Sequence, residues 1–345
     1  MKVGIIGASG YTGAELLRLL GGHPEVEVAY VTAHTYAGEE VTNLYPHLHG
    51  YDGMSYQEFE AKEALSQADI HFIALPHGES MQVVPSLLDG GAKVVDLSAD
   101  YRLSDPLVYR HWYGIDHSSA YLLEKAVYGL PELFADEISG ADLVAVPGCY
   151  PTAVILALAP LADAGYEGLK EVIVDAKTGV SGAGRALSLA THYPQAEGSV
   201  KPYNVGGHRH IPEMEEVLKA LYGGYTGIIF TPHLVPMSRG ILATCYVKMG
   251  KKASASKIIE LYREYYKEQP FIVLEDEGAF PETKAVCGSN YCRIGWHLDS
   301  TKGMLVVASV IDNLIKGASG QAVQCMNIMM GWNEDLGLKA LGIFP

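Results

Sequence analysis

The chain is poor in basic residues. Its 25 lysines and arginines are outnumbered by 40 aspartates and glutamates, which gives a formal net charge of −15 at pH 7. A nucleic-acid backbone or an anionic membrane requires a basic surface on its partner. We therefore expect neither nucleic acid nor membrane as a partner, and any phosphate group that the protein binds must be held locally.

Cysteine is also scarce, and it lacks the spacing of a disulfide framework or zinc site. The five cysteines are an odd number without CxxC pairs, at positions 149, 245, 287, 292 and 325. Such usage favours a reducing compartment. No leader is apparent ahead of Lys2, and no apolar run reaches membrane-spanning length. We expect a cytoplasmic protein.

The composition is that of an ordinary globular chain. It has 345 residues, of which 48% are hydrophobic and 19% charged, so it exceeds what one hydrophobic core usually serves. We expect two domains, one formed by residues 1–148 with about 312–345 and the other by residues 149–311.

The N-terminus has the pattern of a dinucleotide-binding turn. A buried strand is expected at 2–6, and a helix at 14–20, with a GxxGxxG loop between them. Such a loop lets the backbone approach a pyrophosphate at a helix N-terminus, although a purely structural glycine turn is the alternative. The candidate cofactor-binding residues in this loop are Gly7, Ser9, Gly10, Tyr11, Thr12 and Gly13.

A second strand, expected at 26–32, ends without the acidic residue that NAD-specific proteins usually offer to the ribose. Thr32 and His34 stand there instead, which favours NADP. Further strands expected at 70–75, 93–97 and 143–146 alternate with helical stretches, which predicts a doubly wound parallel sheet. Ligands of such sheets collect beyond the carboxyl ends of the strands, where Pro76, Arg102 and Cys149 follow. We expect these residues to share one cleft with the cofactor.

Cys149 has the sequence context of a nucleophile. A β-branched run ends at Pro147-Gly148, and Pro151 suits the first turn of the apolar helix that follows. A thiol at a helix start lies near unpaired backbone N–H groups, which lower its pKa and favour the thiolate. The alternative is a small buried hydrophobic residue.

The second half predicts an α+β domain. Strands are expected at 171–175, 227–235, 240–249 and between 271 and 310, largely antiparallel, with a covering helix at 254–268. A glycine-rich loop carries Arg185 together with Ser181 and Gly182, which are further candidate cofactor-binding residues. Farther along, Pro212 suits a helix start, so His210 would lie at a helix N-terminus, which disfavours imidazolium and keeps a general base neutral.

The C-terminal segment is expected to return to the cofactor cleft. A strand from 304 feeds a turn of small residues and then a closing helix. Asn313 and the nearby glycines suit close backbone approach to the cofactor, and a tight structural turn explains them equally well.

Together these motifs resemble those of a known family. The segment Pro147-Gly-Cys-Tyr-Pro-Thr152, with Ala153 and Pro160, resembles the active-site signature of the N-acetyl-gamma-glutamyl-phosphate reductase family, within the wider aspartate-semialdehyde dehydrogenase group. The other segments that look like family motifs are 7–13, 208–213, 288–290 and 313–322. The resemblance therefore spans essentially the entire chain.

The resemblance implies a Rossmann-type domain and a second domain like that of glyceraldehyde-phosphate dehydrogenase, in a homodimer or homotetramer. It implies NADPH-dependent reduction of a small-molecule acyl phosphate, N-acetyl-L-glutamyl 5-phosphate, to the semialdehyde in arginine biosynthesis. Cys149 would form a thioester and His210 would transfer the proton. The substrate-binding candidates are Arg102, Arg185, His208, Arg209 and Glu213, and which arginine meets which charge stays open.

Other interpretations remain at this point. His208, His210 and Glu213 have the types of a two-histidine, one-carboxylate metal site, although we expect no metal. Tyr121 and Lys125, on an expected charged helix, echo the Tyr-x-x-x-Lys pair of short-chain dehydrogenases. The substrate could be aspartate semialdehyde or a carrier-linked glutamyl or aminoadipyl phosphate. A dinucleotide-binding sensor without chemistry is the non-enzymatic alternative.

Overall fold

The computed structural model describes residues 1–224, 226–250 and 253–344. These residues form two compact units. The first unit consists of Met1–Gly148 and Ala318–Lys339, and the second of Cys149–Gly317 and residues 340–344. The chain thus leaves the first unit immediately before Cys149 and returns to it just before its last helix.

The first unit is built on a parallel sheet. Its six strands have the order β2-β1-β3-β4-β6-β5, and every neighbouring pair is parallel. The strands are β1 (Lys2–Ile6), β2 (Glu27–Thr32), β3 (Ile70–Ile73), β4 (Lys93–Asp96), β5 (Ala126–Tyr128) and β6 (Leu143–Ala145). All residues of β3 and β6 are buried, as expected when helices cover both faces of a parallel sheet. The predicted doubly wound sheet is confirmed.

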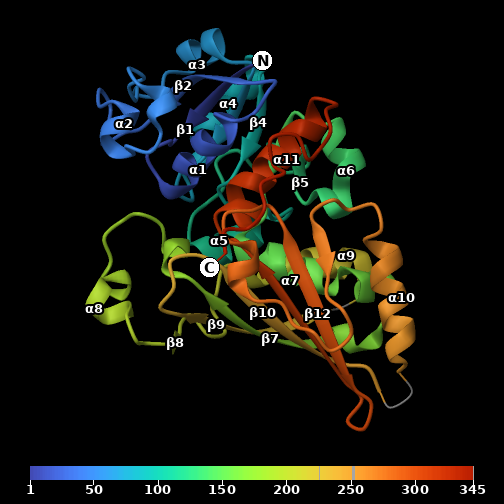
Figure 1. The fold of residues 1–345 in the computed structure, drawn as a ribbon. Coiled ribbons are helices and arrows are strands. Elements are labelled where there is room, and N and C mark those ends of the chain that lie inside the picture. The colour runs from blue at the N-terminus through green and yellow to red at the C-terminus, as the bar shows by residue number, and fades with distance from the viewer. Residues whose placement is uncertain (225, 251–252, 345) are drawn as a thin grey trace. The chain divides into compact units, whose positions relative to one another are not determined.

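Helices surround this sheet (Figure 1). They are α1 (Tyr11–Leu20), α2 (Val41–Leu44), α3 (Ala61–Gln67), α4 (Ser80–Asp89), α5 (Pro106–Tyr113), α6 (Pro131–Ser139) and α11 (Gly320–Met329). Helix α11 packs against α1, α6 and β4. The C-terminal segment therefore completes the first unit, although it follows the whole of the second unit in sequence.

The second unit contains a mixed seven-stranded sheet with the order β11-β12-β13-β10-β7-β9-β8. Its strands are β7 (Glu171–Thr178), β8 (Lys201–Pro202), β9 (Gly227–Leu234), β10 (Ile241–Lys248), β11 (Ile272–Leu274), β12 (Cys292–Asp299) and β13 (Met304–Ile311). Four neighbouring pairs are antiparallel, whereas β7 with β9 and β11 with β12 are parallel. The largely antiparallel character predicted for this sheet is confirmed.

One face of this sheet is covered by helices. Helix α7 (Cys149–Asp163) packs on β10, β12 and β13, and α9 (Ile211–Tyr222) and α10 (Ala255–Tyr265) pack against α7. The short helix α8 (Tyr193–Ala196) stands on an extended loop clear of this sheet (Figure 1). Buried and more exposed residues alternate along β7, because successive side chains point to opposite faces of a strand.

Two local expectations differ from the structure. Residues Ile315–Ser319, expected as a simple turn, form a short π-helix that leads into α11. Tyr121 lies in a three-residue 3₁₀ turn, Ala120–Leu122, and Lys125 follows outside any helix. The geometry that a Tyr-x-x-x-Lys pair requires, with both side chains on one helix face, is therefore absent from this segment.

Candidate active site

Cys149 is the first residue of α7. It is partly exposed, whereas the residues that follow it, from Tyr150 to Ala162, are all buried. Strand β6 ends at Ala145, and Pro151 stands in the first turn, where its missing N–H costs no hydrogen bond. The sequence therefore produces a buried helix with a partly exposed thiol on its first residue, at the end where the first-turn N–H groups have no intrahelical partner.

Gly317 packs directly against this cysteine. A β-carbon at Gly317 would lie 2.8 Å from the Cβ of Cys149 and 3.2 Å from its Cα, closer than such atoms approach in proteins. Only glycine fits at position 317 without a shift of one backbone. The π-helical turn therefore forms one wall around the base of the Cys149 side chain.

Aromatic and imidazole rings gather beside the start of α7. The Tyr203 hydroxyl donates to the Tyr150 hydroxyl at 3.2 Å, and the ring of His208 lies 5.6 Å from that of Tyr150. Burial raises the pKa of Tyr203 to about 12, and the nearby Cys149 charge acts in the same direction. Burial also raises the pKa of Tyr150. Both hydroxyls therefore stay protonated at neutral pH, close to the thiol.

The two histidines of the 208–213 segment have different positions. His210 is the N-cap residue of α9, and its backbone N–H donates to Nδ1 of His208 at 3.1 Å. The two rings lie 4.8 Å apart. Burial, and secondarily the charge of Arg209, lowers the pKa of His208 to about 4. His208 is therefore neutral at pH 7, with its proton on Nε2.

The other two candidate residues of the 208–213 segment differ in exposure. Glu213 lies on the first turn of α9 and is only 2% exposed, whereas Arg209 is exposed. Arg185, predicted as a substrate ligand, is partly exposed in the loop after the 3₁₀ turn Val180–Ala183. The structure thus brings Tyr150, Tyr203, His208 and His210 together in the second unit.

The glycine loop of the first unit has the shape that its sequence requires. Gly7 has a φ of +88°, and a β-carbon there would lie 2.5 Å from the carbonyl oxygen of Ala74. A β-carbon at Gly13 would lie 2.5 Å from the carbonyl oxygen of Ala8, so α1 packs tightly on the loop. These close approaches bring the loop backbone to the N-terminus of α1, at the carboxyl edge of the sheet.

Side chains from neighbouring segments hold this loop. The backbone N–H of Gly7 donates to the Thr32 hydroxyl at 3.2 Å. The Tyr45 hydroxyl donates to the carbonyl of Ser9 at 2.8 Å, and that of Ser319 to the carbonyl of Thr12 at 2.9 Å. Thr32, predicted as a cofactor ligand, is thus a buried support of the loop.

The surface at the carboxyl edge of the first sheet carries the other predicted cofactor residues. Gly10 is the N-cap residue of α1, and Tyr11 is 37% exposed. His34 and Pro76 are also exposed, and they follow β2 and β3. Because these strands are parallel neighbours of β1, their carboxyl ends lie at one edge. The first unit therefore offers these residues on the same edge.

Beyond β4 lies a buried carboxylate cluster that the sequence reasoning did not identify. Asp100 accepts the backbone N–H of Gly78 at 2.8 Å, the Ser80 hydroxyl at 2.8 Å and the Tyr109 hydroxyl at 2.7 Å. Asp96 is fully buried beside it, and burial, with the charge of Asp100, raises the pKa of Asp96 to about 7. This cluster fixes the turn after β3. The Ser-Ala-Asp spacing after a strand was its only sequence signal.

Arg102 serves the backbone of the first unit. Its Nε donates to the carbonyl of Val146 and its Nη2 to the carbonyl of Leu97, both at 2.8 Å. These carbonyls follow β6 and β4. Arg102, predicted as a substrate ligand, therefore ties together the two strand ends that precede Cys149.

Ser181, Gly182 and Asn313 lie together, although they are far apart in sequence. The Asn313 amide donates to the Ser181 hydroxyl at 3.0 Å and accepts the backbone N–H of Gly240 at 2.7 Å. A β-carbon at Gly182 would lie 3.8 Å from Nδ2 of Asn313. Arg239 immediately precedes Gly240 and so lies beside this contact. The sequence did not single out Arg239, because an arginine in a loop between two strands belongs to no motif.

No set of three or more His, Cys, Asp and Glu residues in the described part of the chain is grouped as a metal site, the 208–213 segment included. None of the described helices combines the length and the apolar character needed to cross a membrane.

Comparison with known proteins shows which proteins share this architecture. Residues 2–141 match the NAD-binding domain of semialdehyde dehydrogenases, and residues 149–313 match their dimerisation domain. Over 96% of its length the chain has the fold of aspartate semialdehyde dehydrogenase II from Vibrio cholerae, covering 98% of that chain, with a TM-score of 0.73 at 18% identity. A Candida albicans aspartate semialdehyde dehydrogenase crystallised with NADP gives a TM-score of 0.71 at 16% identity, over 95% of this chain and 98% of the other. The two domain matches define the class of this protein, which is that of the semialdehyde dehydrogenases.

Sequence similarity is more specific. The chain is 49% identical over 345 residues to the N-acetyl-gamma-glutamyl-phosphate reductase of Desulforudis audaxviator, covering all of both chains. It is 51% identical over 346 residues to that of Geotalea daltonii, again over the full length of both. This chain belongs to the N-acetyl-gamma-glutamyl-phosphate reductase family.

Proposed function

We propose that this chain reduces N-acetyl-L-glutamyl 5-phosphate to N-acetyl-L-glutamate 5-semialdehyde, a step of arginine biosynthesis, through a thioester on Cys149. Full-length identity near one half to reductases of this name carries the proposal. The local structure at Cys149 supports it, because a partly exposed thiol at a helix N-terminus is suited to nucleophilic attack.

In the first step the Cys149 thiolate attacks the acyl carbon, a C–S bond forms, and the C–O bond to phosphate breaks. Inorganic phosphate leaves with the electron pair of that bond. The backbone N–H groups at the start of α7 stabilise the charge that develops on the carbonyl oxygen. Cationic side chains receive the carboxylate and phosphate groups, for which Arg185 and Arg209 remain candidates.

When bound, a reduced nicotinamide would supply the hydride that reduces the carbonyl carbon of the thioester. His210, at the N-terminus of α9, first takes the proton of the Cys149 thiol, then donates it to the oxygen of the resulting thiohemiacetal and takes it back as the C–S bond breaks. The aldehyde then departs and the thiolate is restored. His208 accepts the backbone N–H of His210 and so holds this residue in place.

The cofactor that we propose is NADPH, bound at the loop Gly7–Gly13 of the NAD-binding domain. The residues of this chain fit a dinucleotide, since the glycines leave room for a pyrophosphate beside the N-terminus of α1. No carboxylate stands at the end of β2, where Thr32 and then exposed His34 occur, so nothing there repels a 2′-phosphate. A reducing, cytoplasmic location suits the free thiol.

We also propose a homodimer, or a homotetramer built from it, as the working assembly. The region 149–313 matches a dimerisation domain. On the sheet face opposite α7, Ile173 and Ile229 are 46% and 51% exposed, and a second copy would cover them. Light scattering coupled to size-exclusion chromatography measures the mass of the protein in solution directly. A monomeric mass at all protein concentrations would contradict the proposed dimer or tetramer.

Trapping the thioester tests the proposed chemistry. Without nicotinamide, incubation with N-acetylglutamyl phosphate should add one N-acetylglutamyl group to the peptide that carries Cys149, and hydroxylamine should remove it. Intact-protein and peptide mass spectrometry measure this adduct. An adduct on Cys287, the other partly exposed cysteine, or an active Cys149→Ser protein, would contradict the scheme.

A further inference from the structure

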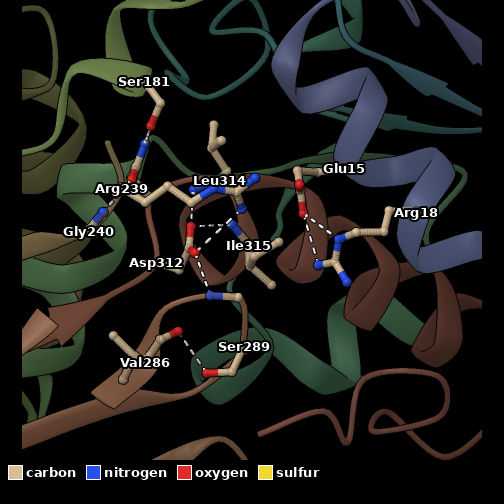
Figure 2. Close-up of polar contacts among 12 residues, drawn as sticks. Glu15, Arg18, Ser181, Arg239, Gly240, Val286, Ser289, Asp312, Leu314 and Ile315 are labelled. Carbon is tan, nitrogen blue, oxygen red and sulfur yellow. Dashed lines mark hydrogen bonds and ion pairs between the residues drawn. The ribbon is translucent and has the colours of Figure 1, made fainter. Parts of the chain in front are cut away.

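The buried carboxylate of Asp312 joins separate segments of the second unit (Figure 2). One oxygen accepts the backbone N–H of Gly288 at 2.7 Å, and the other accepts the N–H groups of Leu314 at 2.8 Å and Ile315 at 3.3 Å. Asp312 is fully buried. An ionised carboxylate suits this place, because every partner is a donor and both oxygens accept.

Asp312 thereby fixes the turn that contacts the reactive cysteine. Its side chain caps the first residues of the π-helix, and its backbone carbonyl accepts the N–H of Gly317 at 3.0 Å. Gly317 is the residue that packs on Cα and Cβ of Cys149. A short, well-defined chain of contacts therefore leads from the Asp312 carboxylate to the position of the thiol.

The same carboxylate also holds a cation. Nη1 of Arg239 lies 3.6 Å from Asp312, and the Arg239 side chain is 29% exposed. The next residue, Gly240, donates its backbone N–H to the amide of Asn313. Arg239 is thus fixed through its side chain by Asp312 and through its neighbouring backbone by Asn313.

We propose that Asp312 is a positioning residue for the reductase reaction, which holds the turn 312–317 against Cys149 and the Arg239 guanidinium in one arrangement. The inference rests on the proposed function of Cys149. In an Asp312→Asn variant only one side-chain oxygen can accept hydrogen bonds, although several donors converge there. The NH₂ group that replaces the other oxygen is itself a donor and would face one of these donors. The turn and the arginine would then lose their common anchor.

The test compares kcat, KM and the pH dependence of Cys149 alkylation by iodoacetamide in Asp312→Asn, Arg239→Gln and the double variant. We expect each single change to lower kcat/KM by about tenfold or more, since small displacements near reacting groups are costly. The double variant should be no worse than the poorer single variant, because the two residues act as a unit. Asp312→Asn should also shift the alkylation profile.

Asp299→Asn is the matched control. Asp299 ends β12 and accepts the backbone N–H groups of Thr301 and Lys302, with an ion pair to Lys302 at 2.7 Å. It lies opposite Met304, the first residue of β13, whereas Asp312 follows the last. The control should leave kcat/KM and alkylation unchanged, although it removes a similar carboxylate.

Two results would overturn the inference. They are additive losses in the double variant, and an Asp312→Asn protein with unchanged alkylation and kcat/KM. Should Asp312→Asn not fold, Arg239→Gln alone still decides, because its partly exposed side chain can be replaced without a cavity and unchanged kinetics would refute the linkage. Failure of the proposed function is a separate outcome, recognised by full activity of Cys149→Ser.

Discussion

Gly317 and Cys149 lie in direct backbone contact, with 2.8 Å between the Cβ of Cys149 and the position that a β-carbon at 317 would take. The last residue of the 149–317 segment of the second unit therefore touches the first residue of that segment. This contact couples the π-helical turn to the start of α7, where the proposed nucleophile stands.

Gly317→Ala should displace the turn or the cysteine, because an added methyl group has no space. We expect kcat to fall by about a hundredfold, the order of loss that a displacement of roughly 1 Å produces, with a lower rate of Cys149 alkylation. Gly140→Ala, at a position with a φ of −95° where an added β-carbon meets nothing within 4 Å, tests the effect of a general Gly→Ala change. Equal kcat in Gly317→Ala and wild type would refute the coupling.

Thr32→Val should weaken dinucleotide binding without unfolding the first unit. The change removes the acceptor of the Gly7 N–H but keeps the shape of the side chain. We expect the Kd of NADPH to rise by about twofold to tenfold, the worth of one ordinary hydrogen bond. Fluorescence titration measures it, with Thr301→Val, an exposed position in the second unit, as the control. An unaltered Kd would show that Thr32 does not shape the loop for the cofactor.

The glycine loop and the cysteine helix could be predicted because their signals are local. Gly7, Gly13 and Pro151 stand where a tight turn, a close approach and a helix start require them. The Asp100 cluster and the Asp312 anchor could not be predicted, since their partners come from distant segments that only the folded sheets bring together. Thr32 was placed correctly at a strand end, but its hydroxyl serves the loop, which spacing alone does not reveal.

The two histidines should differ in their effect on the reaction. In His208→Asn the side-chain oxygen can replace Nδ1 as acceptor of the His210 N–H, so we expect kcat within about tenfold of wild type. His210→Asn removes the proposed proton donor and should lower kcat by about 10²- to 10⁴-fold. Steady-state kinetics at pH 7 compare them. A larger loss of kcat in His208→Asn than in His210→Asn would indicate that His208, and not His210, transfers the proton.

Burial of His71 should make the first unit sensitive to acid. The side chain is fully buried in β3 against Gly4, and burial lowers the pKa of His71 to about 4. Between pH 6.5 and 4 the unfolded chain binds the proton and the folded chain does not, so stability is full above pH 6.5 and declines as pH falls. The shift corresponds to about 3 kcal/mol.

His71→Leu should therefore flatten the dependence of the urea unfolding midpoint on pH between 7 and 4. Exposed His49→Leu controls for the loss of a histidine without burial. Equal slopes in wild type and His71→Leu would show that His71 does not contribute to acid unfolding.

The most direct test of the account is the reverse reaction, measured as the absorbance of reduced nicotinamide with N-acetylglutamate semialdehyde, phosphate and NADP. We predict turnover that requires phosphate, exceeds that with NAD or with aspartate semialdehyde, and disappears in Cys149→Ala. Turnover that persists without phosphate or without the Cys149 thiol would contradict the thioester mechanism. Absence of turnover in folded protein that binds NADP would contradict the proposed substrate.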